Sequence, residues 1–122
     1  MRTAIQIRAA RVCLEDDGEG YPLLLLHGFP ATRQLWTRVA PLLAGAGFRV
    51  LTPDLVGYGE SEAPMGVPID MASQARWMVE LLDELAVTRV SIIAHDVGSA
   101  AAQLMVVNEP QRVRSLAVLD GV

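Results

Sequence analysis

The sequence predicts an α/β protein built on a mostly parallel sheet of about six strands flanked by helices. Two observations lead to this fold class. Several short runs are apolar without alternation, which is typical of strands covered on both faces, and segments with helical spacing of apolar residues separate these runs. Strands of this kind, alternating with helices, form one parallel sheet with right-handed crossovers.

The predicted buried strands are four apolar runs, at residues 23–26, 48–52, 90–94 and 116–119. The stretch 3–15 carries β-branched residues in rough alternation and leads into a turn-rich acidic segment, so it predicts one or two edge strands. No internal repeat or low-complexity segment is found, and residues 57–68 are expected to form a long surface loop within one domain, 1–122.

Three segments have the apolar spacing of helices that face a core. The first contains Leu35, Trp36, Val39, Leu42 and Leu43 and is expected to be interrupted at Pro41. The second runs from Met71 to Leu85, with Asp70 placed to cap it. The third, 98–107, ends before Pro110.

Composition excludes several function classes. The net charge is −4 and the sequence pI about 5.0, so we expect no nucleic acid and no anionic membrane as partner. All ten basic residues are Arg; without Lys, neither pyridoxal Schiff-base chemistry nor a Walker A loop can operate. We expect no cofactor and no metal. Cys13 has no disulfide partner, and neither a secretory signal nor a membrane span is evident, which predicts a cytoplasmic protein.

Ligands of parallel sheets bind beyond the carboxyl ends of the strands, so the loops there are the candidate site. The first loop is His27-Gly28-Phe29-Pro30. A glycine after a buried strand allows a sharp turn and frees backbone N–H groups to face a developing negative charge. This tetrapeptide alone is weak support for a catalytic site.

A second loop, Ala94-His95-Asp96-Val97-Gly98, has an acid between small residues where a strand meets a helix. Small residues two before and two after the centre are what a tight strand-to-helix turn requires, and such a turn exposes its central side chain. The Val97 N–H would lie at the helix N-terminus, where negative charge is favoured. The alternative role for Asp96 is an ordinary helix cap.

Together with "DLVGYGES" at 54–61, these two loops resemble the α/β-hydrolase fold, and the resemblance covers nearly the whole chain. An Asp at the elbow resembles the epoxide hydrolase and haloalkane dehalogenase branch. The resemblance implies that Asp96 is a nucleophile that forms an alkyl ester, and that Phe29 and Val97 supply oxyanion-hole N–H groups. His27, Gly28 and Gly98 would shape the loops.

In several members of this branch, the acid that orients the base histidine stands 24 residues after the nucleophile, which here is Asp120. The alternative for Asp120 is a turn residue beside Gly121. The branch takes its base histidine from a loop after the eighth strand, so 1–122 is expected to be an incomplete core without lid, base or strands 7 and 8. His27 and His95 are not expected to replace the base, since alternation would turn His95 away from Asp96.

The resemblance also bears on substrate. Many haloalkane dehalogenases and epoxide hydrolases place Trp after the nucleophile, and fluoroacetate dehalogenases place Arg there and three residues later, whereas this chain has Val97 and Ala100. Phe29-Pro30 after His27-Gly28 resembles epoxide hydrolases and fluoroacetate dehalogenases more than the Asn usual in haloalkane dehalogenases. An epoxide hydrolase-like activity on a small hydrophobic substrate therefore ranks above a haloalkane dehalogenase-like one. A non-catalytic remnant that binds a hydrophobic ligand or partner is the remaining alternative. The strand 116–119 is expected to leave an open edge prone to self-association.

Overall fold

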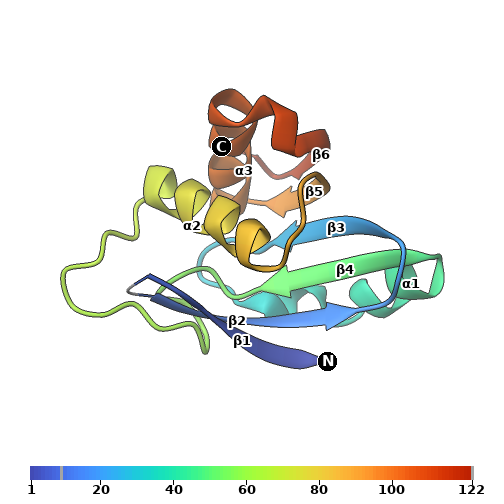
Figure 1. Ribbon diagram of the computed structural model, residues 1–122, viewed down its shortest axis with the longest axis horizontal. Helices are drawn as coiled ribbons and strands as arrows, with labels where there is room; N and C mark the ends of the chain where they lie inside the picture. Colours follow the sequence, from blue (N-terminus) through green and yellow to red (C-terminus); the bar gives the residue numbers. More distant parts are fainter. Residues whose placement is uncertain (9, 122) are drawn as a thin grey trace.

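A single six-stranded sheet organises the chain in a computed structural model, which describes residues 1–8 and 10–121 (Figure 1). The strands are β1 (Arg2–Ile7), β2 (Ala10–Asp17), β3 (Tyr21–Leu26), β4 (Phe48–Pro53), β5 (Val90–His95) and β6 (Val113–Leu119). Their order is β1-β2-β4-β3-β5-β6. The two pairings that involve β2 are antiparallel, and β4, β3, β5 and β6 run parallel. The predicted mostly parallel sheet is confirmed.

The stretch 3–15 forms two strands, of which only β1 lies at an edge, because β2 also pairs with β4. Ala9, which falls within that stretch, lies outside the described residues. At the other end of the sheet, β6 pairs with β5 on one side. Among the described residues, no strand pairs with the outer side of β6.

Helices cover both faces of the sheet. They are η1 (Arg33–Trp36), α1 (Ala40–Gly45), α2 (Met71–Glu84), α3 (Val97–Asn108) and η2 (Pro110–Arg112). Helices α2 and α3 lie together on one face, in front of the strands in Figure 1, and α1 lies behind them. The Asp70 carboxylate accepts a hydrogen bond from the Ser73 N–H at 3.0 Å, so the predicted cap of α2 is confirmed.

The first predicted helix differs from the expectation. Instead of one helix interrupted at Pro41, the segment forms the short η1 followed by α1, and Pro41 lies in the first turn of α1. Proline lacks the N–H that a helix interior needs but loses nothing in a first turn, where that N–H has no intrahelical partner. Leu42 is consequently 75% exposed, whereas Trp36 is 5% exposed.

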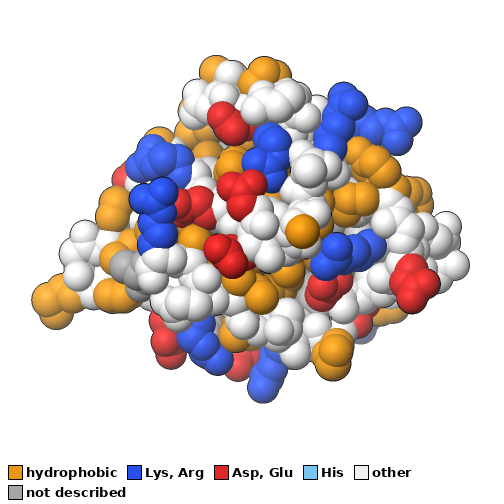
Figure 2. Space-filling model, in the orientation of Figure 1, with side chains coloured by type: hydrophobic (Ala, Val, Ile, Leu, Met, Phe, Trp, Pro, Cys, Tyr) orange, Lys and Arg blue, Asp and Glu red, His pale blue; other side chains and the backbone are white. Residues whose placement is uncertain are grey.

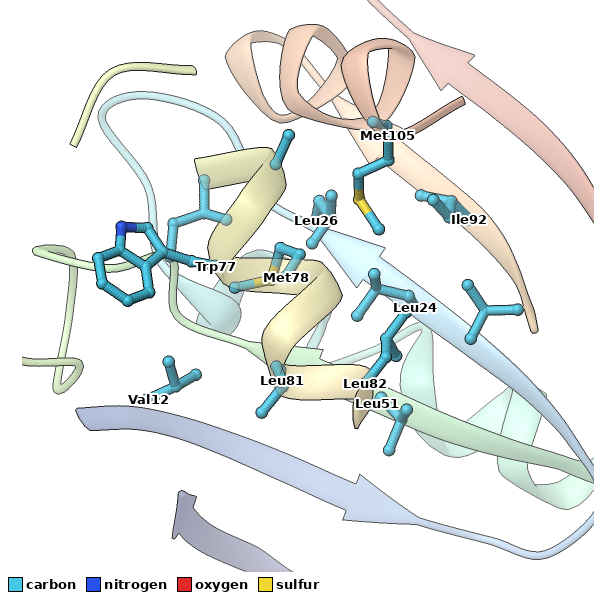
Figure 3. Close-up of a cluster of buried hydrophobic side chains, with 14 of the residues drawn as sticks. Val12, Leu24, Leu26, Leu51, Trp77, Met78, Leu81, Leu82, Ile92 and Met105 are labelled. Atoms are coloured by element: carbon cyan, nitrogen blue, oxygen red, sulfur yellow. The ribbon is translucent and has the colours of Figure 1, made fainter. Parts of the chain in front are cut away.

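The main core lies between the sheet and the helix pair α2 and α3 (Figure 3). Met78, Leu81 and Leu82 of α2 and Met105 of α3 are fully buried against the sheet, beside Leu24 and Leu26 of β3. On the opposite face, Leu25 packs with Trp36 in a smaller cluster. The run 23–26 shows no alternation because successive leucines enter cores on opposite sides of the sheet.

Candidate functional site

The carboxyl ends of β3, β4, β5 and β6 lie along one edge of the sheet, because these four strands are parallel neighbours. The loops that follow them carry His27 to Phe29 after β3, Asp54 after β4, Asp96 after β5 and Asp120 after β6. Val97 and Gly98 of the candidate site begin α3. The amide N–H of Asp96 donates to the Leu119 carbonyl at 3.0 Å, which joins the last two loops.

Asp96 occupies a strained bend between β5 and α3. Its φ of 53° and ψ of −127° lie in a region that non-glycine residues rarely adopt. The main-chain carbonyl of Asp96 accepts hydrogen bonds from the Ser99 N–H at 2.9 Å and from the Ser99 hydroxyl at 2.5 Å. The Asp96 side chain makes no capping hydrogen bond to α3, so the helix-cap alternative is wrong.

The Asp96 carboxylate instead faces the loop after β3. Its Oδ2 accepts a hydrogen bond from the Phe29 N–H at 3.0 Å. This hydrogen bond and the N–H of Val97 hold the pKa of Asp96 below its ordinary value. The two N–H groups that sequence reasoning assigned to an oxyanion hole therefore both stabilise negative charge on the side chain at the elbow.

Two glycines allow the loops to approach this closely. A Cβ on Gly28 would lie 2.5 Å from the Asp96 Cβ and 2.9 Å from Oδ2. A Cβ on Gly98 would lie 2.3 Å from the His27 carbonyl oxygen, which is backbone and cannot swing aside. A larger residue at Gly28 would displace the Asp96 side chain, and a larger residue at Gly98 would push α3 away from the end of β3.

His27 is fully buried beneath the loop. Its Nε2 lies 2.9 Å from the Leu55 amide nitrogen and its Nδ1 lies 2.8 Å from the Gly28 carbonyl oxygen. Burial lowers the pKa of His27, so the ring is neutral at pH 7. A neutral, fully hydrogen-bonded ring agrees with the expectation that His27 does not act as the base.

His95 and Asp120 lie beside each other on the other side of the elbow. His95 Nε2 is 3.5 Å from Asp120 Oδ2, and its Nδ1 is buried without a hydrogen-bond partner among the described residues. His95 was expected to point away from Asp96, but its ring lies near enough to that carboxylate to be one of the causes that lower the pKa of Asp96. The positive φ of Asp96 breaks the alternation on which that prediction depended.

Sequence reasoning missed Arg33, which ties the loops after β3 and β4 together. Its side chain is 6% exposed and Nη1 lies 2.5 Å from Oδ2 of Asp54, which is fully buried. Asp54 also accepts hydrogen bonds from the Arg33 N–H at 2.7 Å and the Glu60 N–H at 2.9 Å. Arg33 also forms ion pairs with Glu15 at 3.2 Å and Glu60 at 2.7 Å. No local pattern in the sequence marks it among the ten arginines, because all three partners are distant along the chain.

An open pocket of about 490 Å³ begins beside the Asp96 site. Phe29 and Tyr58 line it with edge-to-face rings whose centroids are 6.3 Å apart, and Ile69 also lines it. None of its lining residues is charged. Within residues 1–8 and 10–121, no cluster of His, Cys, Asp and Glu is arranged to hold a metal ion, and no helix is long and apolar enough to cross a membrane.

Comparison with known proteins decides the family. The profile of the alpha/beta hydrolase fold family matches residues 21–121, which include every strand end described above. The chain belongs to the alpha/beta hydrolase fold family. The resemblance drawn from the elbow and strand-end motifs is thereby confirmed.

Relatives within the alpha/beta hydrolase family include both dehalogenases and epoxide hydrolases. The chain is 44% identical over 110 residues to a fluoroacetate dehalogenase of Burkholderia sp., and 40% identical over 103 residues to a soluble epoxide hydrolase of Corynebacterium sp.. Each match covers 84% of this chain and 35% of the relative. The chain therefore spans about a third of the length of these two relatives.

Solved structures agree with the sequence matches. The epoxide hydrolase CorEH superimposes with a TM-score of 0.94 at 35% identity, over all of this chain and 42% of that protein. An epoxide hydrolase of Vigna radiata superimposes with a TM-score of 0.91 at 28% identity, over 97% of this chain and 37% of that protein. The six-stranded sheet is thus a partial alpha/beta hydrolase fold.

Proposed function

We propose that this chain carries the nucleophile of a hydrolase that acts on a small uncharged substrate with an electrophilic carbon, an epoxide in the first place. The observation that carries the proposal is the geometry of Asp96. Its carboxylate stands at a strained bend and is held by the Phe29 N–H at 3.0 Å. A carboxylate with a lowered pKa is ionised at pH 7 and needs no base before it attacks.

The hydrogen bond to the Asp96 carboxylate indicates which of its two oxygens attacks the substrate in the first step. Oδ2 of Asp96 accepts the Phe29 N–H, so Oδ1 is the oxygen that attacks. A bond forms between Oδ1 and an epoxide carbon, the carbon–oxygen bond of the ring breaks, and the released oxygen takes a proton from water. The product is a 2-hydroxyalkyl ester of Asp96 whose carbonyl oxygen, the former Oδ2, remains beside the Phe29 and Val97 N–H groups.

An uncharged, apolar substrate is proposed because the surroundings provide no counter-charge. The pocket that begins at Phe29 is lined by uncharged residues, and the positions one and four residues after Asp96 are Val97 and Ala100. A substrate carboxylate would be desolvated there without a partner. Epoxides rank first because relatives and matched structures are named epoxide hydrolases; haloalkanes are the second candidate because another relative is named haloalkane dehalogenase.

Release of the product requires water activated by a base to attack the ester carbonyl. No residue of the 122 is proposed as this base, and residues 1–122 are proposed to form an incomplete core of the family fold. Asp120 is proposed as the acid that would orient such a base, since it follows β6 at the same edge of the sheet as Asp96.

The test is intact-mass measurement of the chain after incubation with styrene oxide. We expect a mass increase of one probe molecule, located on Asp96 by peptide fragmentation and lost in Asp96→Asn. A matched control is Asp83→Asn, which removes a carboxylate on α2 that is paired with Arg112 and is 59% exposed. The control should still form the adduct.

Three other results would contradict the proposal or its ranking of substrates. Equal labelling of the wild type and Asp96→Asn would show that the probe reacts with exposed carboxylates in general. Absence of an adduct over long incubation, together with saturable binding of the same probe, would favour a non-catalytic remnant that binds a hydrophobic ligand. An adduct with 1-bromohexane but none with styrene oxide would reverse the order of the two substrate classes.

A further inference from the structure

The proton position on His27 follows from its partners. The Leu55 amide is a donor, so Nε2 of His27 must accept and is unprotonated. The proton of the neutral ring therefore resides on Nδ1, where it donates to the Gly28 carbonyl at 2.8 Å. That carbonyl also accepts from the Ala31 N–H at 3.1 Å, so two donors fix its direction.

The Gly28 carbonyl belongs to the same peptide unit as the Phe29 N–H. The Gly28–Phe29 bond is trans, and in a planar trans peptide the carbonyl and the N–H point in opposite directions. Holding the carbonyl toward His27 therefore turns the N–H toward the other side of the loop. There it donates to Oδ2 of Asp96 at 3.0 Å.

From this geometry we propose that His27 is a positioning residue of the Asp96 site. Its Nδ1–H orients and polarises the Gly28–Phe29 peptide, so that the Phe29 N–H is aimed at the oxygen of Asp96 that becomes the ester carbonyl. Hydrogen bonds in series strengthen one another, because each donor polarises the next group along the chain. The relay runs from the Leu55 N–H through the His27 ring and the peptide to Asp96.

The role of His27 in catalysis rests on the proposed function, but the relay itself is a property of the loop. Burial leaves little freedom for an alternative arrangement: His27 is 0% exposed and its ring centroid lies 5.3 Å from that of Tyr58. If His27 only filled space, its ring would not need a proton on Nδ1 or hydrogen bonds at both of its nitrogens.

Two substitutions separate the relay from packing. The side-chain nitrogen of Asn occupies the place of Nδ1, and the side-chain polar atoms of Gln occupy the place of Nε2. His27→Asn therefore keeps a donor to the Gly28 carbonyl, whereas His27→Gln keeps a partner for the Leu55 N–H and loses that donor. Both lose the imidazole ring and its contact with Tyr58, so packing is lost in both.

The first measurement is the pKa of Asp96, from carbon-13 NMR of its carboxyl group. We expect the pKa of Asp96 to rise in His27→Gln and to stay near the wild-type value in His27→Asn, because only the former releases the Phe29 N–H. Equal values in the two variants would overturn the inference. So would nitrogen-15 NMR of the wild type that shows Nδ1 unprotonated, a result that needs no folded variant.

The second measurement connects the relay to chemistry. Hydroxylamine attacks the carbonyl of the Asp96 ester, places negative charge on its oxygen, and leaves a hydroxamate when the alkoxide departs as the alcohol. We expect this cleavage to be roughly tenfold slower in His27→Gln than in His27→Asn. If the wild type forms no adduct, the proposed function fails, while the pKa measurement still decides whether His27 positions Phe29.

Discussion

At the scale of single residues, the site depends on charges that are held in place by specific hydrogen bonds. Asp96 is held by two backbone N–H groups, and Asp54 by the side chain of Arg33 and two more N–H groups. Asp54 is fully buried, so its charge is sustained only by these partners. The loops after β3 and β4 are thus joined by a buried ion pair.

Asp54→Asn should lower the free energy of unfolding by about 2 kcal/mol, since it removes the one fully buried carboxylate that Arg33 contacts and leaves only its ion pairs with Glu15 and Glu60. Urea denaturation followed by circular dichroism measures this loss. Asp83→Asn breaks an ion pair with Arg112 in which the carboxylate is 59% exposed, and it should cost about 1 kcal/mol or less. Equal losses in the two variants would show that the Asp54 pair contributes no more than a surface pair.

The lowered pKa of His27 makes stability depend on pH. Because the folded pKa lies below the unfolded value, the unfolded chain binds the extra proton first, and stability falls as pH drops below about 6.5. We expect a decrease of at most about 1.4 kcal/mol per pH unit from this one proton. Urea midpoints at pH 7.5, 6.0 and 5.0 should fall for the wild type and change less for His27→Asn.

Carboxylates make the free energy of unfolding depend on pH in a lower range. The pKa of Asp96, Asp70 and Glu60 is lowered, so each contributes stability above its unfolded pKa that is lost as pH falls through the folded value. This second loss begins below about pH 4.5, whereas the loss linked to His27 begins near pH 6.5. A wild-type profile that is flat from pH 7.5 to 5.0 would contradict the assignment of His27 as buried and neutral.

At the scale of elements, the position of Asp96 is set by the packing of β5, α3 and β3. Strand β5 ends at His95 and α3 begins at Val97, and β3 packs against both. The contact of α3 with the end of β3 is made through Gly98, next to the backbone oxygens of Leu26 and His27. Helix α3 is otherwise rich in small residues, from Gly98 to Ala102, which brings its axis close to the sheet. The direction of Asp96 is therefore a consequence of helix and strand packing.

Gly98→Ala should destabilise the fold by about 3 kcal/mol, because the new methyl group would meet backbone at 2.3 Å. Gly45→Ala is the matched control: a Cβ there has no neighbour within 4 Å, and its effect should be neutral or stabilising by about 0.5 kcal/mol. Thermal unfolding compares the pair. A Gly98→Ala protein as stable as Gly45→Ala would mean that α3 can shift without cost.

At the scale of the whole molecule, the central strands of the sheet are buried, and among the described residues β6 is an edge strand whose outer side is unpaired. Both faces of β3 and β4 are buried, whereas β6 is exposed along much of its length, with Val118 39% and Leu119 48% exposed. Arg, Asp and Glu side chains are interspersed on the face shown in Figure 2. Charge therefore does not gather into a basic patch there, and the uncovered apolar strand is the more prominent surface feature.

We predict that the isolated chain associates through the outer edge of β6. Sedimentation velocity should show a mass that rises with concentration, and Val118→Lys should reduce this rise because a charge at the edge opposes strand pairing. Leu42→Lys is the matched control, since Leu42 is 75% exposed on α1, away from that edge. A monomer at high concentration, or equal effects of the two substitutions, would contradict the prediction.

The sequence by itself determined the fold class, the place of the elbow and the cap of α2. These are local signals: the spacing of apolar residues follows the period of each element, small residues flank a tight turn, and a capping residue directly precedes its helix. The same signals placed His27, Gly28 and Asp96 at strand ends. They did not reveal where η1 ends and α1 begins, because proline at a first turn and proline as an interruption have similar sequence patterns.

Only the tertiary structure decided which of these residues meet. The strand order β4-β3-β5-β6 brings Arg33 to Asp54, Phe29 to Asp96 and His95 to Asp120, across sequence separations that no local pattern encodes. It also decided that the Asp96 side chain accepts the Phe29 N–H rather than capping α3. The physical reason is that hydrogen bonds and buried ion pairs depend on distance and direction in the folded chain, whereas the sequence specifies only which groups are available.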